Sequence, residues 1–537
     1  MNSTKFITRG NEVRHMPREV ASQVNAVVLA AQNGHSACVK NAESLVGELD
    51  RLYEADSIDG DEWALAAFTV SSVLINFAGY RRNKRAAKLG TDIADRARLL
   101  AADTHLRRNL EYNAGNGRSC LHQLAHDRAE LTAGQYVAAR LLDRDLLKEA
   151  RALFFGVGYD ASVASELRGM ALCNLANLFD DSGRWVEAYQ AYSDALEADP
   201  TNGNASGNAA YLLRRRISTG RGTLGHYAVV HDAFVRHSKA HRQRTVDLAG
   251  EQVARNWDAV ELLGGHGHAE HGGDVLDEYQ QWIKDHRFAL TLAVDGLGTD
   301  SARWDSAMIE SLQTTSVGMP PIYASVNVLK AEYLVSRRLA FSGEQRLLDA
   351  PLGQSPDDSG VYADTLDMAV YGEASSSLVL AQRSTLDLLD KIAVAANEHF
   401  SVGLDPENVT FKAFWVKGQP ALLHPALPVP PADFTPSALS LAELAVDFTD
   451  GIYEAAKTLR NAGTHRLVNL TWAMELDDKP DDATHVRIDL RGLITASHSS
   501  LAVARAAYLY LLDLVADRED TRTHDGPVFD MPMFFQD

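Results

Sequence analysis

The residues with the clearest chemical potential lie in the stretch RNAGTH, residues 460–465. A guanidinium stays charged at physiological pH and holds two phosphate oxygens at once, whereas an imidazole titrates near neutrality and can give or take a proton. An Arg and a His that share an exposed face are therefore suited to phosphodiester chemistry. Arg460 and His465 are the candidates that this stretch offers.

Spacing alone is weak evidence for such a site. The pattern Arg-x4-His occurs three times, at Arg221/His226, Arg236/His241 and Arg460/His465. Only the last continues as Arg-Asn-x3-His, through Asn461, and lies in a strongly periodic segment. The residues by themselves leave two interpretations open, a catalytic site or a solvated polar face.

The segment that carries the motif, residues 440–476, predicts one long amphipathic helix. Its apolar residues recur at steps of three and four: Leu441, Leu444, Ala445, Phe448, Ile452, Ala455, Ala456 and Leu459. At about 100° per residue, Arg460, Asn461 and His465 fall on the face opposite this stripe. We therefore expect these three side chains to point away from the core.

A second long helix is predicted over residues 375–400, with an apolar face and three notable polar residues, Asp387, Asp390 and Lys391. The two carboxylates could help to set the pKa of His465, or they could form a structural salt bridge. The intervening proline-rich stretch, near residues 418–437, predicts an irregular connector.

Composition points to a soluble protein. The chain has 537 residues, 46% of them apolar, which predicts two to four domains with sizeable cores. Neither a long apolar run nor a signal peptide is evident, so we expect a cytoplasmic protein without a membrane partner. Three widely spaced cysteines, Cys38, Cys120 and Cys173, fit no disulfide or metal pattern and are expected to be buried thiols.

The net charge of −20 argues against a broad nucleic-acid-binding surface, so any RNA contact must be local. Basic clusters occur near residues 81–88, 214–216 and 236–244, each of which could equally be a solvated helix face. No cofactor or metal site is expected. His266, His268 and His271 lie among glycines, which favours a flexible junction over a metal site, and the acidic turn of Asp477, Asp478, Asp481 and Asp482 favours a solvated loop over a cation site.

The first half of the chain predicts paired helices. Residues 169–202 match the tetratricopeptide (TPR) pattern, in which two antiparallel helices interlock through small residues and a proline, here Pro200, ends the second. One repeat cannot bury its own face, so several must stack into a helical solenoid. Such a solenoid could bind a protein partner or only hold other domains.

Six stretches in the second half resemble the HEPN superfamily, in the branch with TPR repeats in front. They are YQQWIKDHRFAL (279–290), VLKAEYLVSRR (328–338), DTLDMAVYG (364–372), LLDKIAVAANEHF (388–400), VTFKAFW (409–415) and LRNAGTHRL (459–467). The expected fold is all-α, a TPR-like helical solenoid followed by a HEPN helical bundle. We expect a tail at residues 1–20, repeats at 21–260, a junction at 261–275 and the HEPN-like domain at 276–537.

The resemblance implies a metal-independent endoribonuclease of the phage-defence, abortive-infection or toxin type that acts as a homodimer. In that family scheme His465 is the general acid/base, Arg460 holds the phosphate and Asn461 orients one of them, so that the 2′-OH of RNA attacks and leaves a 2′,3′-cyclic phosphate. The TPR-like half would bind a protein or phage-derived trigger.

The motif centre, Ala462-Gly463-Thr464, departs from the bulkier helix formers of related sequences. Gly463 lowers helix propensity by about 1 kcal/mol relative to Ala and could allow a bend between Arg460 and His465. Together with the acidic charge, this keeps open a non-catalytic scaffold or sensor. A nucleotide-sensing or nucleotidyl-transfer function is a weaker alternative, because the chain has no GxxxxGK[ST] loop.

Overall fold

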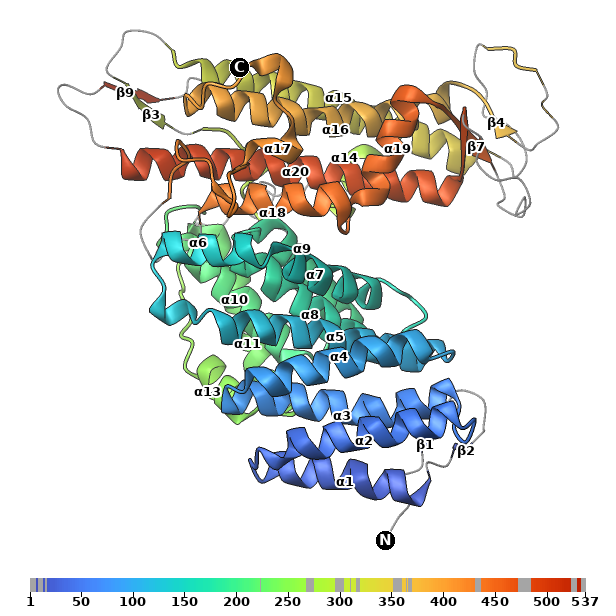
Figure 1. The fold of residues 1–537 in the computed structure, drawn as a ribbon. Coiled ribbons are helices and arrows are strands. Elements are labelled where there is room, and N and C mark those ends of the chain that lie inside the picture. Colours follow the sequence, from blue (N-terminus) through green and yellow to red (C-terminus); the bar gives the residue numbers. More distant parts are fainter. Residues whose placement is uncertain are drawn as a thin grey trace. The chain divides into compact units, whose positions relative to one another are not determined.

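The chain divides into two compact units, and Figure 1 labels most of their helices and strands. The first unit comprises Met1–Leu178 and Gln190–Ala205, and the second comprises Phe179–Tyr189 and Ser206–Asp537. The structure is a computed structural model that describes residues 6–7, 13–14, 17–222, 224–266, 275–294, 304–309, 311–314, 319–350, 360–363, 365, 369–429, 436–471, 484–522 and 529–532. Helices dominate both units, which confirms the predicted all-α class.

The first unit begins with α-helices that follow one another along the chain. They are α1 (Arg18–Gln32), α2 (Ala37–Glu54), α3 (Gly60–Arg81), α4 (Lys84–Leu100), α5 (Thr104–Ala125), α6 (Ala133–Leu142) and α7 (Arg144–Gly158), after a short hairpin of β1 (Phe6–Ile7) and β2 (Val13–Arg14). Successive long helices such as α3, α4 and α5 pack against each other. A Cβ atom at Gly117 of α5 would lie 2.1 Å from Oγ1 of Thr91 in α4, so glycine permits this close approach.

Two helices, α8 (Ser165–Asp181) and α9 (Trp185–Ala198), lie where the two-helix repeat is predicted, and Pro200 follows the second helix. The turn between them uses Gly183 at a φ of +76°, a conformation that side chains disfavour. Four further helices continue the helical region: α10 (Gly203–Ser218), α11 (Leu224–Ala240), α12 (Arg242–Ala249) and α13 (Glu251–Asp258). The assignment of this region to the TPR family, and its domain boundaries, stay predictions.

The C-terminal part of the second unit is a bundle of long helices. Its elements are α14 (Glu278–Asp285), α15 (Pro321–Asp349), α16 (Glu373–His399), α17 (Phe411–Phe414), α18 (Ser437–Asp450), α19 (Glu454–His465) and α20 (Leu490–Thr521). α15 runs beside α16, as Figure 1 shows, and both α16 and α18 pack against α20. α19, which carries the RNAGTH motif, contacts α16, α18 and α20.

Short strands accompany this bundle, and the sequence did not predict them. β4 (Ala369–Val370), β7 (Leu467–Thr471) and β8 (His485–Asp489) form a three-stranded sheet in which β7 and β8 are parallel. Two further pairs are β3 (Ser311–Thr314) with β9 (Phe529–Pro532), and β5 (Val416–Lys417) with β6 (Leu422–Leu423). Because β7 begins one residue after Arg466, the sheet fixes the direction in which the chain leaves the motif.

The predicted single helix over residues 440–476 is wrong in two respects. It breaks between α18 and α19, and the chain after His465 forms strand β7 (Leu467–Thr471) instead of continuing the helix. Gly451 ends α18 with a backbone outside the helical region (φ −120°, ψ −144°). A Cβ atom there would lie 2.7 Å from the Cα atom of Asp447, so only glycine fits this bend. The periodic apolar residues continue on both sides, which explains why the pattern concealed the break.

A buried cluster of charges joins residues 179–189 to the bundle within the second unit. The guanidinium of Arg184, fully buried, donates to both carboxylate oxygens of Glu187 and to Asp447 of α18. The hydroxyls of Tyr453 and Tyr510 also donate to Glu187. Burial would lower the pKa of Arg184, but the negative charges of Glu187 and Asp447 raise it well above its usual value.

Two described helices, α3 and α20, are long and apolar enough to cross a membrane by length and composition alone. In the most apolar window of each, 61% and 78% of the residues, respectively, are buried inside the structure. Core helices of soluble proteins pass the same test, so this is weak evidence for a membrane span.

Candidate active site

The RNAGTH motif occupies the last turns of α19, and an apolar stripe fixes this helix on its neighbours. Ala456, Leu459 and Ala462, spaced at three residues, are buried. In addition, the side-chain amide of Gln382 in α16 donates a buried hydrogen bond of 2.7 Å to the carbonyl oxygen of Ala456. Apolar packing and this hydrogen bond together hold the motif against α16.

Gly463 lies where α19 approaches α16 closely. A Cβ atom at this position would be 3.2 Å from Cδ of Arg383 and 3.5 Å from Cγ1 of Val379. The helix is continuous from Glu454 to His465, so glycine does not interrupt it. The close contact with α16 accounts for a small residue here.

Arg460 is held by two carboxylates of α16. Its Nε and Nη2 atoms donate to Oδ1 of Asp387 at 3.1 and 2.8 Å, and Nη2 also lies 3.3 Å from Oδ2 of Asp390. The Asp387 and Asp390 side chains are 45% and 38% exposed, so this is a partly solvated ion pair. The structure therefore contains the salt bridge, one of the two alternatives for these carboxylates. The cation that both carboxylates contact is Arg460.

Asp390 makes a further hydrogen bond that Asp387 does not make among the described residues. Its Oδ1 atom accepts a 2.8 Å hydrogen bond from the backbone N–H of Phe411, at the start of α17. Asp390 therefore ties the chain after α16 to that helix, whereas both contacts of Asp387 orient the guanidinium of Arg460.

Asn461 and His465 are exposed, as the helix periodicity predicted. The amide oxygen of Asn461 lies 3.4 Å from Nη1 of Arg460. Among the described residues, no hydrogen bond or ion pair joins His465 to Arg460 or to Asp387. The structure thus brings Arg460, Asn461 and Asp387 together and leaves the imidazole open to solvent.

Lys391, another predicted supporting residue, lies apart from this group. It is exposed, and its ammonium pairs with Glu332 of α15. The pair links α15 to α16 and has no recorded contact with Arg460 among the described residues. Gln382 and Arg383, which the sequence analysis did not select, contact α19 instead; their place one turn before Asp387 on a helix is the signal that could have found them.

The match Arg221/His226 differs from the motif in α19, because its histidine is buried and its arginine is paired with carboxylates. Arg221 pairs with Asp517 and Asp520. His226 is 2% exposed, and its Nε2 atom contacts the carbonyl oxygen of Val294. Both side chains therefore serve local structure.

The Gly/His-rich junction is described as far as His266. Its Nε2 atom lies 2.7 Å from Oδ2 of Asp232. The backbone N–H of Gly264 donates to the same oxygen, and that of Leu263 donates to Oδ1. Burial would raise the pKa of Asp232, but these contacts and the one from His231 lower it to about 2. His268, His271 and the four aspartates of the acidic turn lie outside the described residues.

Comparison with known proteins identifies one family. Residues 313–518 match a family model described as LA2681-like HEPN, and this range includes α15 to α19 and most of α20. No curated protein and no solved structure matches the chain. The match confirms the HEPN resemblance, whereas the TPR-like branch stays a prediction.

Proposed function

Residues 313–518 form a HEPN domain of the LA2681-like family, and from this premise we propose that the chain is a metal-independent endoribonuclease. HEPN domains are commonly ribonucleases that bind RNA and dimerise. The observation that carries the proposal is the exposed end of α19, where a partly buried arginine and an open imidazole follow an anchored apolar stripe.

In the proposed reaction His465 removes the proton of a ribose 2′-OH, and the 2′-oxygen attacks the adjacent phosphorus. The bond from phosphorus to the 5′-oxygen breaks, and that oxygen takes up a proton from the protonated imidazole, so the proton removed from the 2′-OH is returned. The products are a 2′,3′-cyclic phosphate and a 5′-hydroxyl. Because RNA itself supplies the nucleophile, no metal-bound water is needed.

Arg460 stabilises the charge that develops on the phosphoryl oxygens. Asp387 occupies Nε and Nη2 of its guanidinium, which leaves Nη1 directed towards Asn461 as the donor for phosphate. Asn461 then orients the phosphate or the guanidinium. Asp387 acts as a positioning residue, because it acts through Arg460.

We place this reaction in a homodimer, in which the second copy supplies a second motif to a shared cleft. No hydrogen bond or ion pair joins His465 to Arg460 among the described residues. A second copy could supply the group that completes the site, because acid/base and phosphate-binding groups must meet around one phosphodiester. Light scattering of the full chain at micromolar concentration tests it. A dimer is expected, and a monomer would count against a shared cleft.

We also propose that the helical repeats regulate the nuclease as part of a defence or toxin system, by binding a protein or phage-derived trigger. The support is the segment Phe179–Tyr189, which runs from the end of α8 into the start of α9. It belongs to the second unit and contacts the HEPN bundle there. Trp185 donates to Asp513 of α20, and Glu187 accepts from Tyr453, directly before α19. A conformational change in this segment would therefore alter contacts of Tyr453, the residue directly before α19, and could move the first turn of that helix.

A non-catalytic scaffold is the second candidate, and the pairing of Arg460 with two carboxylates favours it. Expression of the wild type and of His465→Ala in cells, with and without phage, separates the two functions. The nuclease predicts toxicity and degraded total RNA with the wild type only. Intact RNA in both strains under phage challenge would support the scaffold.

A further inference from the structure

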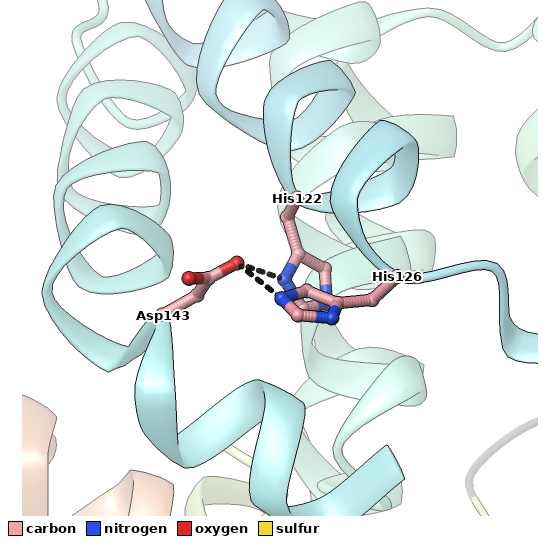
Figure 2. Close-up of side chains that lie close together, drawn as sticks. All are labelled: His122, His126 and Asp143. Atoms are coloured by element: carbon pink, nitrogen blue, oxygen red, sulfur yellow. Dashed lines mark hydrogen bonds and ion pairs between the residues drawn. The ribbon is translucent and has the colours of Figure 1, made fainter. Parts of the chain in front are cut away.

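Three potential metal ligands meet at the end of α5 in the first unit (Figure 2). His122 lies in the last turn of this helix, and His126 is the residue that ends it. Asp143 lies between α6 and α7. Two histidines four residues apart project from one side of a helix, and Figure 2 shows both rings turned towards the carboxylate of Asp143.

The distances suit a small divalent ion. Nδ1 of His122 lies 2.9 Å from Oδ2 of Asp143, and Nε2 of His126 lies 3.2 Å from the same oxygen. All three candidate ligand atoms lie within 4.8 Å of one another. Neighbouring ligands of a tetrahedral Zn²⁺ site, with bonds of about 2.0–2.2 Å, lie about 3.3–3.5 Å apart. Shifts of less than about 1 Å would therefore complete three ligand positions.

The surroundings of the ligands also suit an ion. His122 is 6% exposed, so its ring offers a ligand atom that is shielded from solvent. Arg140 repels a cation, but its guanidinium is held by the hydroxyl of Tyr136 and the carbonyl oxygen of Leu178, and Asp143 supplies an opposite charge.

A simple hydrogen-bonded His-Asp-His group is the alternative. The second cluster of this kind, His286, Glu344 and His498 in the second unit, fits that description well. There Trp282 donates to one oxygen of Glu344 while His498 lies 2.6 Å from the other. At Asp143 both imidazoles converge instead on a single oxygen, so one ion could replace the two protons that the hydrogen bonds would need.

We propose that His122, His126 and Asp143 bind a divalent transition-metal ion, with Zn²⁺ as the preferred ion and a fourth position open to water. Two imidazoles and one carboxylate form a ligand set that zinc accepts. The ion would fasten the end of α5 to the junction of α6 and α7. The site belongs to the first unit and takes no part in the proposed reaction of His465.

The test uses the full chain, stripped of metal and then dialysed with Zn²⁺. Metal content, the visible absorption of Co²⁺ added in place of zinc, and the melting temperature are measured for the wild type and three variants. His126→Ala removes a partly exposed ligand at a helix end, where the fold tolerates change. His105→Ala is the matched control, an exposed histidine of the same helix, and His498→Ala tests the second cluster.

The wild type, His105→Ala and His498→Ala should each hold about one Zn²⁺ per chain, the stoichiometry of a single site. They should also show the Co²⁺ bands and melt at higher temperature with Zn²⁺. His126→Ala should lose all three properties while it keeps the helical circular-dichroism spectrum. The proposal is overturned if the wild type binds no ion, if His126→Ala binds as well as the wild type, or if His498→Ala is the variant that loses the ion.

Discussion

The guanidinium of Arg460 has two acidic neighbours with different tasks. Asp387 accepts from Nε and Nη2, whereas Asp390 makes one longer contact and holds the backbone of Phe411 with its other oxygen. Exposed ion pairs of this kind contribute only about 0–1 kcal/mol to stability. The importance of Asp387 should therefore lie in the orientation of Arg460 and show itself in catalysis.

We predict that Asp387→Asn lowers the rate of RNA cleavage about tenfold, through kcat more than KM, because a misplaced guanidinium stabilises the transition state less well. The melting temperature should stay near that of the wild type. Asp390→Asn serves as the comparison and should have the smaller effect on cleavage. Equal activity of Asp387→Asn and the wild type would show that this carboxylate does not position Arg460.

Substitutions of Gly463 test how tightly the motif centre packs against α16. An added methyl group meets only Cδ and Cγ of Arg383 and Cγ1 of Val379, and the long arginine side chain can move. Gly463→Ala should therefore be tolerated, with stability within about 1 kcal/mol of the wild type, since the gain in helix propensity offsets the crowding. Gly463→Val should destabilise the chain. Urea denaturation of both variants measures this, and a strongly destabilised Gly463→Ala would contradict it.

At the residue scale the sequence predicted the exposed Asn461 and His465 from helix periodicity alone. It could not identify the partner of Asp387, because a salt bridge between two helices depends on their packing and not on spacing within one helix. The cluster of His122, His126 and Asp143 was missed as well. The spacing His-x3-His was its signal, but the third ligand comes from another helix junction.

Helix boundaries and strands were harder to predict than helices. The break at Gly451 stayed hidden because the apolar period continues across it, and its cause is a close backbone approach to Asp447 that the sequence does not reveal. The short strands β4, β7 and β8 also escaped prediction, since β4 and β7 pair residues about 100 positions apart, a register that only the folded chain defines.

The buried charges beside α18 make a prediction at this scale. Arg184→Met leaves the carboxylates of Glu187 and Asp447 buried without their cation, which should destabilise the fold by about 3–5 kcal/mol. Arg255→Met is the control, because Arg255 is 67% exposed and pairs with Glu251 on a single helix turn. Urea denaturation should separate the two variants clearly. Similar midpoints would mean that the network contributes little.

The ends of α16 and α20 should make stability depend on pH. Burial, followed by the charges of Arg518 and Arg522, lowers the pKa of His399 to about 4. The unfolded chain then binds more protons than the folded chain between pH 6.5 and 4, so stability falls on acidification, by up to about 1.4 kcal/mol per pH unit. Burial raises the pKa of Asp517 to about 6, which makes stability rise on acidification. The contribution of His399 must therefore be measured as the difference in stability between the wild type and a variant that lacks the imidazole.

His399→Phe removes the imidazole and keeps an aromatic ring of similar shape beside Phe400. The stability of the wild type minus that of the variant should therefore decline as pH falls from 6.5 to 4 and be constant above pH 7. Denaturation curves at several pH values measure this difference. A difference that is flat over the whole range would contradict the account of His399.

For the whole molecule, the predicted all-α class is confirmed, because Ala- and Leu-rich amphipathic segments specify helices wherever they pack. Domain boundaries were harder to predict than the fold class. Phe179–Tyr189 groups with the second unit although it lies inside the predicted repeat, and contacts of its buried Arg184 and Trp185 explain why. Such long-range pairs cannot be inferred from local sequence pattern, so the boundaries near residues 261–275 stay predictions.

We propose that the end of α19 cleaves RNA without a metal. The direct measurement incubates purified full chain with RNA in buffer containing EDTA and determines the ends of the products. Wild type and Thr458→Ala, an exposed position of the same helix outside the motif, should produce fragments with 2′,3′-cyclic phosphate ends. His465→Ala and Arg460→Ala should produce none while they remain folded. Fragments of the same kind and amount from His465→Ala would contradict the account.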